Sequence, residues 1–122
     1  MSAEPGCGTV PAPSAALLQR AAALLQVVGH PARVHVLLAL AREGALTAGQ
    51  LSERVRIEAS ALSHHLRLLR DARLVRSAPR GRHRVYALDD PHVAHIVEDA
   101  VRHVAEDPQA EDLLPQADDV TG

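Results

Sequence analysis

The segment 59-ASALSHHLRLLRDA-72 divides into two faces when it is drawn as a helix at about 100° per residue. One face is apolar and carries Leu62, Leu66 and Leu69. The opposite face carries small polar and basic side chains, namely Ser60, Ser63, His64 and Arg67. Small side chains allow a helix backbone to approach another molecule closely, and serine and arginine both hydrogen-bond to base edges. The segment therefore predicts a helix that packs by its leucines and contacts DNA by its other face.

The residues before this segment predict a helix-turn-helix. Thr47 and Gln50 have the spacing of a capping box, which predicts a short helix that continues through Val55. A tight turn over residues 56–58 then leads into the helix at 59–72. A short helix, a turn and a second helix with an exposed polar face form the DNA-reading unit of many regulators.

The residues after it predict a basic hairpin. Residues 74–78 and 82–88 read as two strands around a Pro79-Arg80-Gly81 turn. An arginine-bearing hairpin beside a helix-turn-helix is a wing, and it is placed to touch the DNA backbone or minor groove beside the recognition helix.

Three further helices complete the expected domain. After Ser14, apolar residues recur at helical spacing, namely Leu17, Leu18, Ala21, Leu24, Leu25 and Val28. A second helix is predicted over 31–43, with Val34, Leu37, Leu38 and Ala41 turned inward. The last helix starts at Asp90-Pro91 and is expected to bury Ile96, Val97, Ala100, Val101 and Val104. The predicted fold is mainly α: a winged helix-turn-helix of five helices and a two-stranded hairpin wing.

The length of 122 residues fits one domain with one core. We expect a disordered arm at 1–13, the domain at 14–107 and an acidic flexible tail at 108–122. Because no signal peptide or uncharged apolar run of about 20 residues is found, we expect a cytoplasmic protein that does not associate with a membrane. Cys7, the single cysteine, is expected to be a free thiol in the arm.

The net charge of −2 hides a strong asymmetry along the chain. Residues 54–84 hold nine arginines against two acids, whereas residues 85–122 hold ten acids and one arginine. Clustered arginines suit phosphate and guanine contacts, which indicates double-stranded DNA as the partner. With one tyrosine and no Phe or Trp, the chain lacks the aromatic platform of an RNA- or single-strand-binding sheet. The expected DNA-contacting residues are Ser60, Ser63, His64, Arg67, Arg70, Arg80 and Arg82.

With these features the sequence resembles the ArsR/SmtB family of bacterial metal-sensing regulators over residues 14–107. Three stretches carry the resemblance: His30-Pro31-Ala32-Arg33, Leu62-Ser63-His64-His65-Leu66-Arg67-Leu68-Leu69, and Arg80-Gly81-Arg82 leading to Tyr86. Two positions depart from it. Ala59 stands where many relatives carry a glutamine that can read adenine, and Ala72-Arg73 stands where a turn that ends in glycine is more usual.

One face of the last helix carries potential metal ligands at His92, His95, Asp99, His103 and Glu106. The pattern Asp90-X-His92, ten residues, His103-X-X-Glu106 matches the sensing motif of the resembled family, which implies that these four residues are the ligands. His92 and His103 are about 16.5 Å apart along one helix, whereas a metal lies about 2.0–2.2 Å from each ligand. One chain therefore cannot complete the site. Two such helices that run antiparallel across a two-fold axis give two equivalent sites, which predicts a homodimer with the last and first helices at the interface.

Two imidazoles and two carboxylates suit Ni(II) or Zn(II), with Co(II) a further candidate. His95 is a candidate additional ligand, which a six-coordinate nickel site would need. The resemblance implies a repressor that metal usually releases from its operator. Two alternatives stay open. One is a regulator of the same fold without metal input, controlled by a partner protein at the acidic C-terminal segment. The other is a metallohydrolase, which is disfavoured because no second motif supplies an open cleft and a general base.

Overall fold

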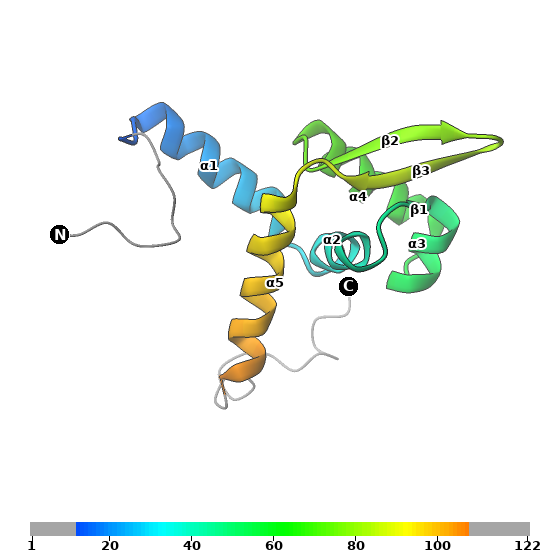
Figure 1. The fold of residues 1–122 in the computed structure, drawn as a ribbon. Helices are drawn as coiled ribbons and strands as arrows, with labels where there is room; N and C mark the ends of the chain where they lie inside the picture. The colour runs from blue at the N-terminus through cyan, green and yellow to red at the C-terminus, as the bar shows by residue number, and fades with distance from the viewer. Residues whose placement is uncertain (1–11, 108–122) are drawn as a thin grey trace.

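The computed structural model describes residues 12–107, and most of that range is helical. In chain order the elements are α1 (Ala15–Val28), α2 (Pro31–Glu43), β1 (Leu46–Thr47), α3 (Ala48–Val55), α4 (Ala59–Asp71), β2 (Val75–Arg80), β3 (His83–Leu88) and α5 (Pro91–Glu106). Figure 1 shows α1 and the β2–β3 hairpin extending in opposite directions from the centre, where α2 lies. The expected N-terminal arm up to residue 11, with Cys7, and the expected acidic tail at 108–122 lie outside the described residues.

The predicted helix starts are confirmed, and every helix except α4 has a side-chain capping contact at its start. The Ser14 hydroxyl accepts a hydrogen bond from the Leu17 amide at 3.1 Å and opens α1. At α3, the Gln50 amide donates to Thr47 Oγ1 at 3.1 Å, and the Thr47 amide donates to Gln50 Oε1 at 2.9 Å. This reciprocal pair is the predicted capping box. Asp90 caps α5 in a similar way, ahead of Pro91.

The sheet differs from the predicted two-stranded hairpin. It has three antiparallel strands in the order β1-β3-β2, because the short strand β1 pairs with β3 at Leu46↔Tyr86. The turn is also displaced: Pro79 lies within β2 opposite Arg84, and Arg80 pairs with His83. The hairpin loop is therefore residues 81–82, and Gly81 takes the positive φ of 61° that a tight two-residue hairpin loop requires. Pro79 is tolerated because β2 is an edge strand.

The core is built from aliphatic side chains of α2, α3, α4, the sheet and the first half of α5. Its largest fully buried side chains are Leu37, Leu51, Leu62, Leu69 and Val36. The predicted inward face of α4 is confirmed, since Leu62, Leu66 and Leu69 are all buried. His65, on the same helix, is buried with them at 9% exposure. The core thus holds α4 in place by one side and leaves its other side open to solvent.

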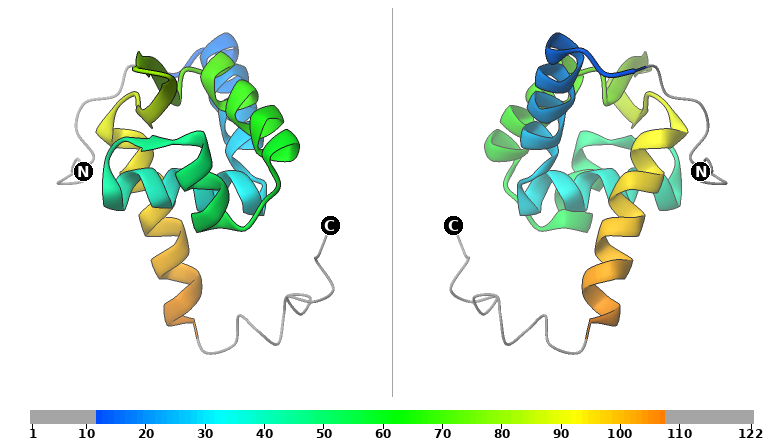
Figure 2. Two further views of the ribbon diagram at one scale, coloured as in Figure 1. Left: turned by 90° about the vertical axis from the view of Figure 1, so that its right-hand side faces the viewer. Right: turned by 90° about the vertical axis from the view of Figure 1, so that its left-hand side faces the viewer.

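The prediction for the buried face of α5 is wrong for the single chain. Val97 is buried and Val93 joins it, but Ile96, Val101 and Val104 are 45%, 39% and 46% exposed. Ala100 is exposed as well. Figure 2 shows part of the reason: the C-terminal half of α5, which carries Val101 and Val104, projects past the other helices.

Helix α1 shows the same lack of cover. None of its residues is buried, and Leu18 and Leu25 are 57% and 54% exposed. Among residues 12–107, no single helix is long and apolar enough to cross a membrane. Taken together, α1 and α2 pass that test by length and composition, but they are bent by 88° at the break between them.

Two arginines adopt a left-handed backbone conformation that glycine adopts at lower cost. They are Arg56, which follows α3 with a φ of 58°, and Arg73, which follows α4 with a φ of 61°. For an L-residue this conformation costs about 1–2 kcal/mol. Arg73 is also the position at which a glycine is more usual in the resembled family. The fold therefore tolerates strain at both ends of the recognition helix.

We expect Arg73→Gly to stabilise the protein by about 1 kcal/mol, since it relieves the left-handed strain. For a domain of this size that gain corresponds to a rise of roughly 4–8 °C in the melting temperature, measured by circular dichroism. Gly81→Ala is the matched control. Gly81 has a φ of +61° and open space around its Cα, so this change should lower the melting temperature by strain alone. A melting temperature that falls in Arg73→Gly would contradict the assignment of strain.

Candidate DNA-binding surface and metal site

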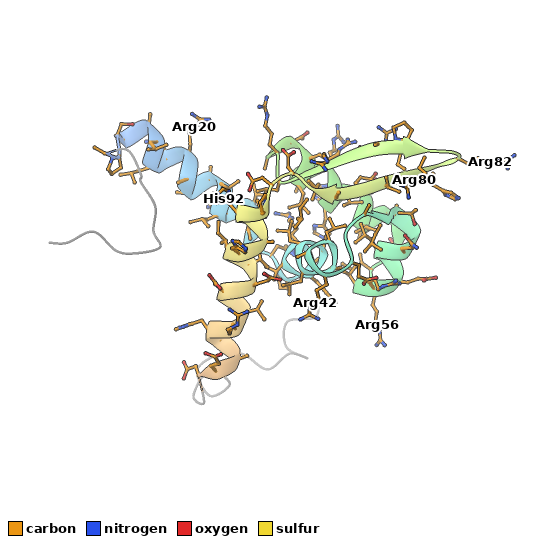
Figure 3. The ribbon with its side chains drawn as sticks, viewed as in Figure 1. Arg20, Arg42, Arg56, Arg80, Arg82 and His92 are labelled. Carbon is orange, nitrogen blue, oxygen red and sulfur yellow. The ribbon has the colours of Figure 1, made fainter. Side chains whose placement is uncertain are left out.

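The open face of α4 brings five of the predicted DNA-contacting residues together. Ser60, Ser63, His64, Arg67 and Arg70 are all exposed; the first four lie on the side away from the buried leucines, and Arg70 lies at the edge of that side. Figure 3 shows the other two, Arg80 and Arg82, at the far end of the wing. The structure therefore separates the candidates into a helix group and a wing-tip group.

Two residues of the helix group have partners within the chain. The Ser60 hydroxyl donates to Glu58 Oε1 at 2.5 Å, so a carboxylate lies at the start of the exposed face of α4. The Arg70 guanidinium donates to the Ser77 hydroxyl of β2 at 3.3 Å, which ties the end of α4 to the wing. Of the helix group, Ser63, His64 and Arg67 form the central part of the exposed face.

One arginine of the basic segment is committed to an ion pair. Arg54 Nε lies 2.8 Å from Glu43 Oε2 and 3.1 Å from Glu43 Oε1. The NH2 nitrogen of Arg54 lies 2.9 Å from Glu43 Oε1. The hydrogen bond from Arg54 lowers the pKa of Glu43, and the carboxylate raises the pKa of Arg54. The pair joins α3 to α2. Because it is exposed, solvent screening keeps its contribution to stability small.

For His65 the sequence left a structural and a DNA-facing role open, and its burial favours the structural one. Its Nδ1 accepts a hydrogen bond from Arg33 Nε at 3.1 Å, and the His30 ring lies 4.7 Å away, centroid to centroid. Burial lowers the pKa of His65, and the nearby His30, Arg33 and His64 lower it further. These surroundings therefore favour the neutral form of His65. A signal was available, since His65 lies only about 60° from Leu62 on a helix of 100° per residue.

The four predicted metal ligands lie along α5, and all are exposed. Asp90 Oδ1 accepts the His92 amide hydrogen at 2.7 Å and lies 3.3 Å from His92 Nδ1. Oδ1 of Asp90 thus caps the helix, and Oδ2 takes no part in that capping contact. The side chains of His92 and Asp90 are 87% and 56% exposed. Figure 3 shows His92 near the start of α5.

His103 and Glu106 lie at the opposite end of α5, with the exposed His95 between the two pairs. Within residues 12–107, no three His, Cys, Asp or Glu side chains lie close enough together to hold a metal ion. This agrees with the spacing of the ligands along one helix. The donors face solvent at two separate places, and a second chain would be required to bring the pairs together.

A family model described as bacterial regulatory protein, arsR family, matches residues 30–77 of the chain. The chain is 42% identical over 95 residues to the HTH-type transcriptional regulator NmtR of Mycobacterium tuberculosis (strain ATCC 25618 / H37Rv). That match covers 75% of this chain and 78% of the relative. The chain belongs to the ArsR family. Other members resemble it as well, in sequence and in structure.

The HTH-type transcriptional repressor SmtB of Mycobacterium tuberculosis (strain CDC 1551 / Oshkosh) is 37% identical over 102 residues, which cover 83% of this chain and 75% of that protein. In structure, the chain is similar to the AntR antimony-specific transcriptional repressor, with a TM-score of 0.73 and 28% identity. That likeness covers 89% of this chain and 98% of the other. This ArsR-family protein is therefore a winged-helix DNA-binding regulator of transcription and not an enzyme.

The neutral state of His65 predicts how stability depends on pH. The unfolded chain takes up a proton at this residue near pH 6.5, while the folded chain does so only at lower pH. The contribution of neutral His65 to folding stability is therefore complete above about pH 6.5, the pKa of the unfolded chain. It is lost as the pH falls through the pKa of the folded state. We expect the free energy of unfolding, measured with urea, to fall on acidification more steeply for the wild type than for His65→Asn.

His64→Asn is the matched control for this measurement, because His64 precedes His65 on the same helix but is exposed. It should keep the pH dependence of the wild type. Equal slopes for the wild type and His65→Asn would show that His65 does not titrate differently in the two states.

Proposed function

We propose that this ArsR-family protein is a homodimeric repressor that senses Ni(II) or Zn(II), with Co(II) as a third candidate. Asp90 and His92 of one protomer and the partner's His103 and Glu106 would form each metal site. The observation that carries the proposal is the ligand-bearing face of α5. It is exposed over its length, while apolar side chains on the same helix are left without cover in the single chain.

The uncovered side chains of α1 and α5 support a dimer interface. Ile96 is 45% exposed and lies about 40° from His92 around the helix. Leu18 and Leu25 of α1 are more than half exposed. Burial of an apolar side chain of this size contributes about 1.5–3 kcal/mol. An isologous interface through α1 and α5 would cover these side chains and bring the ligand-bearing faces of the two α5 helices together.

The donor set fits a divalent metal of borderline hardness. Imidazole nitrogen and carboxylate oxygen suit nickel, zinc and cobalt, whereas thiolate is the ligand for softer ions. The AntR repressor is named for antimony. This chain has a single cysteine, so it lacks the thiolate ligands that a site for a soft ion such as antimony would need. A bound metal would supply a cross-link between the two α5 helices.

On DNA, the exposed face of α4 would enter the major groove and the wing tip would contact the flanking backbone. Ser63, His64 and Arg67 are placed for base edges, with Ser60 and Arg70 at either end of that face. Arg80 and Arg82 are placed for phosphates. A regulator of the chromosome acts in the cytoplasm, which is where we place this protein.

His103→Ala tests the metal site. In calorimetric titrations with Ni(II) and Zn(II), the wild type should bind two ions per dimer, and His103→Ala should lose both sites because each contains a His103. His35→Ala, an exposed histidine of α2, is the control and should bind as the wild type does. DNA affinity without metal should be the same in all three. Unchanged stoichiometry in His103→Ala would refute the site and favour control by a partner protein.

Arg82→Ala tests the wing contact. Loss of one phosphate contact should weaken binding similarly for all DNA sequences and reduce the slope of log K against log salt by about 1. Arg42→Ala, at the end of α2 away from the wing, should leave that slope unchanged (Figure 3). The measurement is an electrophoretic mobility-shift titration at several salt concentrations. A wild-type slope in Arg82→Ala would exclude Arg82 from the DNA contact.

A further inference from the structure

The side chain of Arg33 connects three elements, α1, α2 and α4. Its Nε donates to His65 Nδ1 of α4 at 3.1 Å, and its NH1 nitrogen donates to the backbone carbonyl of Val27 in α1 at 2.9 Å. Arg33 itself belongs to the first turn of α2. One guanidinium thus contacts the end of α1 and the buried side of the recognition helix at the same time.

The position of Arg33 has an electrostatic explanation. A cation in the first turn of a helix is disfavoured by the helix dipole, whereas a cation at the C-terminal end is favoured. Arg33 lies in the first turn of α2, but its charge is directed to a carbonyl in the last turn of α1, which ends at Val28. That carbonyl is one of the four at a helix end that lack a partner within the helix. The C-terminal end of α1 therefore orients the Arg33 guanidinium through its NH1 nitrogen, and this leaves Nε free to donate to His65 of α4.

The His65 imidazole must be in one tautomer for this contact to exist. A guanidinium carries only donors, so Nδ1 must be the unprotonated nitrogen of the ring. A proton on Nδ1 would remove the acceptor and place a positive charge against Arg33. The charged or titratable side chains that face His65 are Arg33 of α2, His30 before α2 and His64 of α4. All three disfavour a second charge at this place, and the lowered pKa of His65 agrees with that.

We propose that Arg33 and His65 are positioning residues for DNA binding, and that their hydrogen bond sets the orientation of the recognition helix relative to α1. Ser63, His64 and Arg67 are neighbours of His65 on α4, so a small rotation of the helix at His65 moves all of them against the base edges. The contact depends on protonation, and operator affinity falls as His65 takes up a proton. The inference rests on the proposed DNA contact of α4, but it concerns the metal-free protein and does not rest on the proposed metal response.

The test measures DNA affinity by mobility shift in the presence of a chelator. The probe is a duplex that the wild-type protein selects from a random-sequence pool. Arg33→Lys keeps the charge, but a single ammonium cannot reproduce the two-pronged geometry of the guanidinium. It should weaken binding by about 10-fold or more at neutral pH, because a charge-assisted hydrogen bond is lost. Affinity equal to that of the wild type would overturn the proposal.

His65→Asn separates a positioning role from a merely structural one. The Asn Oδ1 lies where Nδ1 lies in histidine, so it can accept from Arg33, but it does not titrate. This variant should bind as the wild type does at neutral pH and should lack the loss of affinity on acidification from about pH 7.5 to 5.5. The two proteins differ only at position 65, so a difference between their pH profiles is assigned to the change at His65.

His65→Leu completes the set, since it fills the buried position without offering an acceptor. It should resemble Arg33→Lys in its weakened affinity, and circular dichroism should show whether it is folded. If Arg33→Lys or His65→Leu does not fold, the comparison between the wild type and His65→Asn still decides. Identical pH profiles for those two proteins would overturn the proposal.

Discussion

The fold depends on a core whose buried hydrophobic side chains are all aliphatic. Leu37, Leu51, Leu62 and Leu69 are almost completely buried, and no Phe or Trp exists in the chain to add volume. Such a core holds α2, α3, α4 and the sheet together, and it reaches only the first half of α5. The recognition helix is consequently fixed from one side, while apolar faces of α1 and α5 stay uncovered. The DNA-reading surface and the surface proposed for a second copy are thus both consequences of how far these leucines and valines extend.

Features of the fold that depend on near neighbours could be predicted from the sequence. Ser14, Thr47 and Asp90 each cap a helix through contacts within three residues, and the structure confirms all three helix starts. Features that depend on distant pairing could not. The strand at Leu46 exists only because Tyr86, forty residues later, offers it an edge. The hairpin turn was misplaced for a related reason, since Pro79 reads locally as a turn residue but is acceptable in a strand that has a free edge.

The candidate sites show the same division. Helical periodicity placed Ser63 and Arg67 on the exposed face of α4, because that face is defined by the helix itself. It could not decide whether Ile96 and Val104 are covered, because an apolar face looks the same whether its own chain or a second copy packs against it. The partner of His65 could not be predicted, since Arg33 is 32 residues away in the sequence. Periodicity gives the face of a helix, and only the tertiary structure gives the partner.

Tyr86 is the one aromatic residue of the Phe, Tyr and Trp class in this chain. It lies half-buried in the middle of the sheet, between Leu46 of β1 and Ser77 of β2, and packs against the core. In the metal-free or metal-loaded protein without DNA, the ultraviolet emission of the unmodified chain therefore originates from a single ring at the base of the wing. The intrinsic fluorescence of this protein therefore reports on one place in the molecule. A conformational change at the far end of α5 that reaches the wing would be detectable in it without any added label.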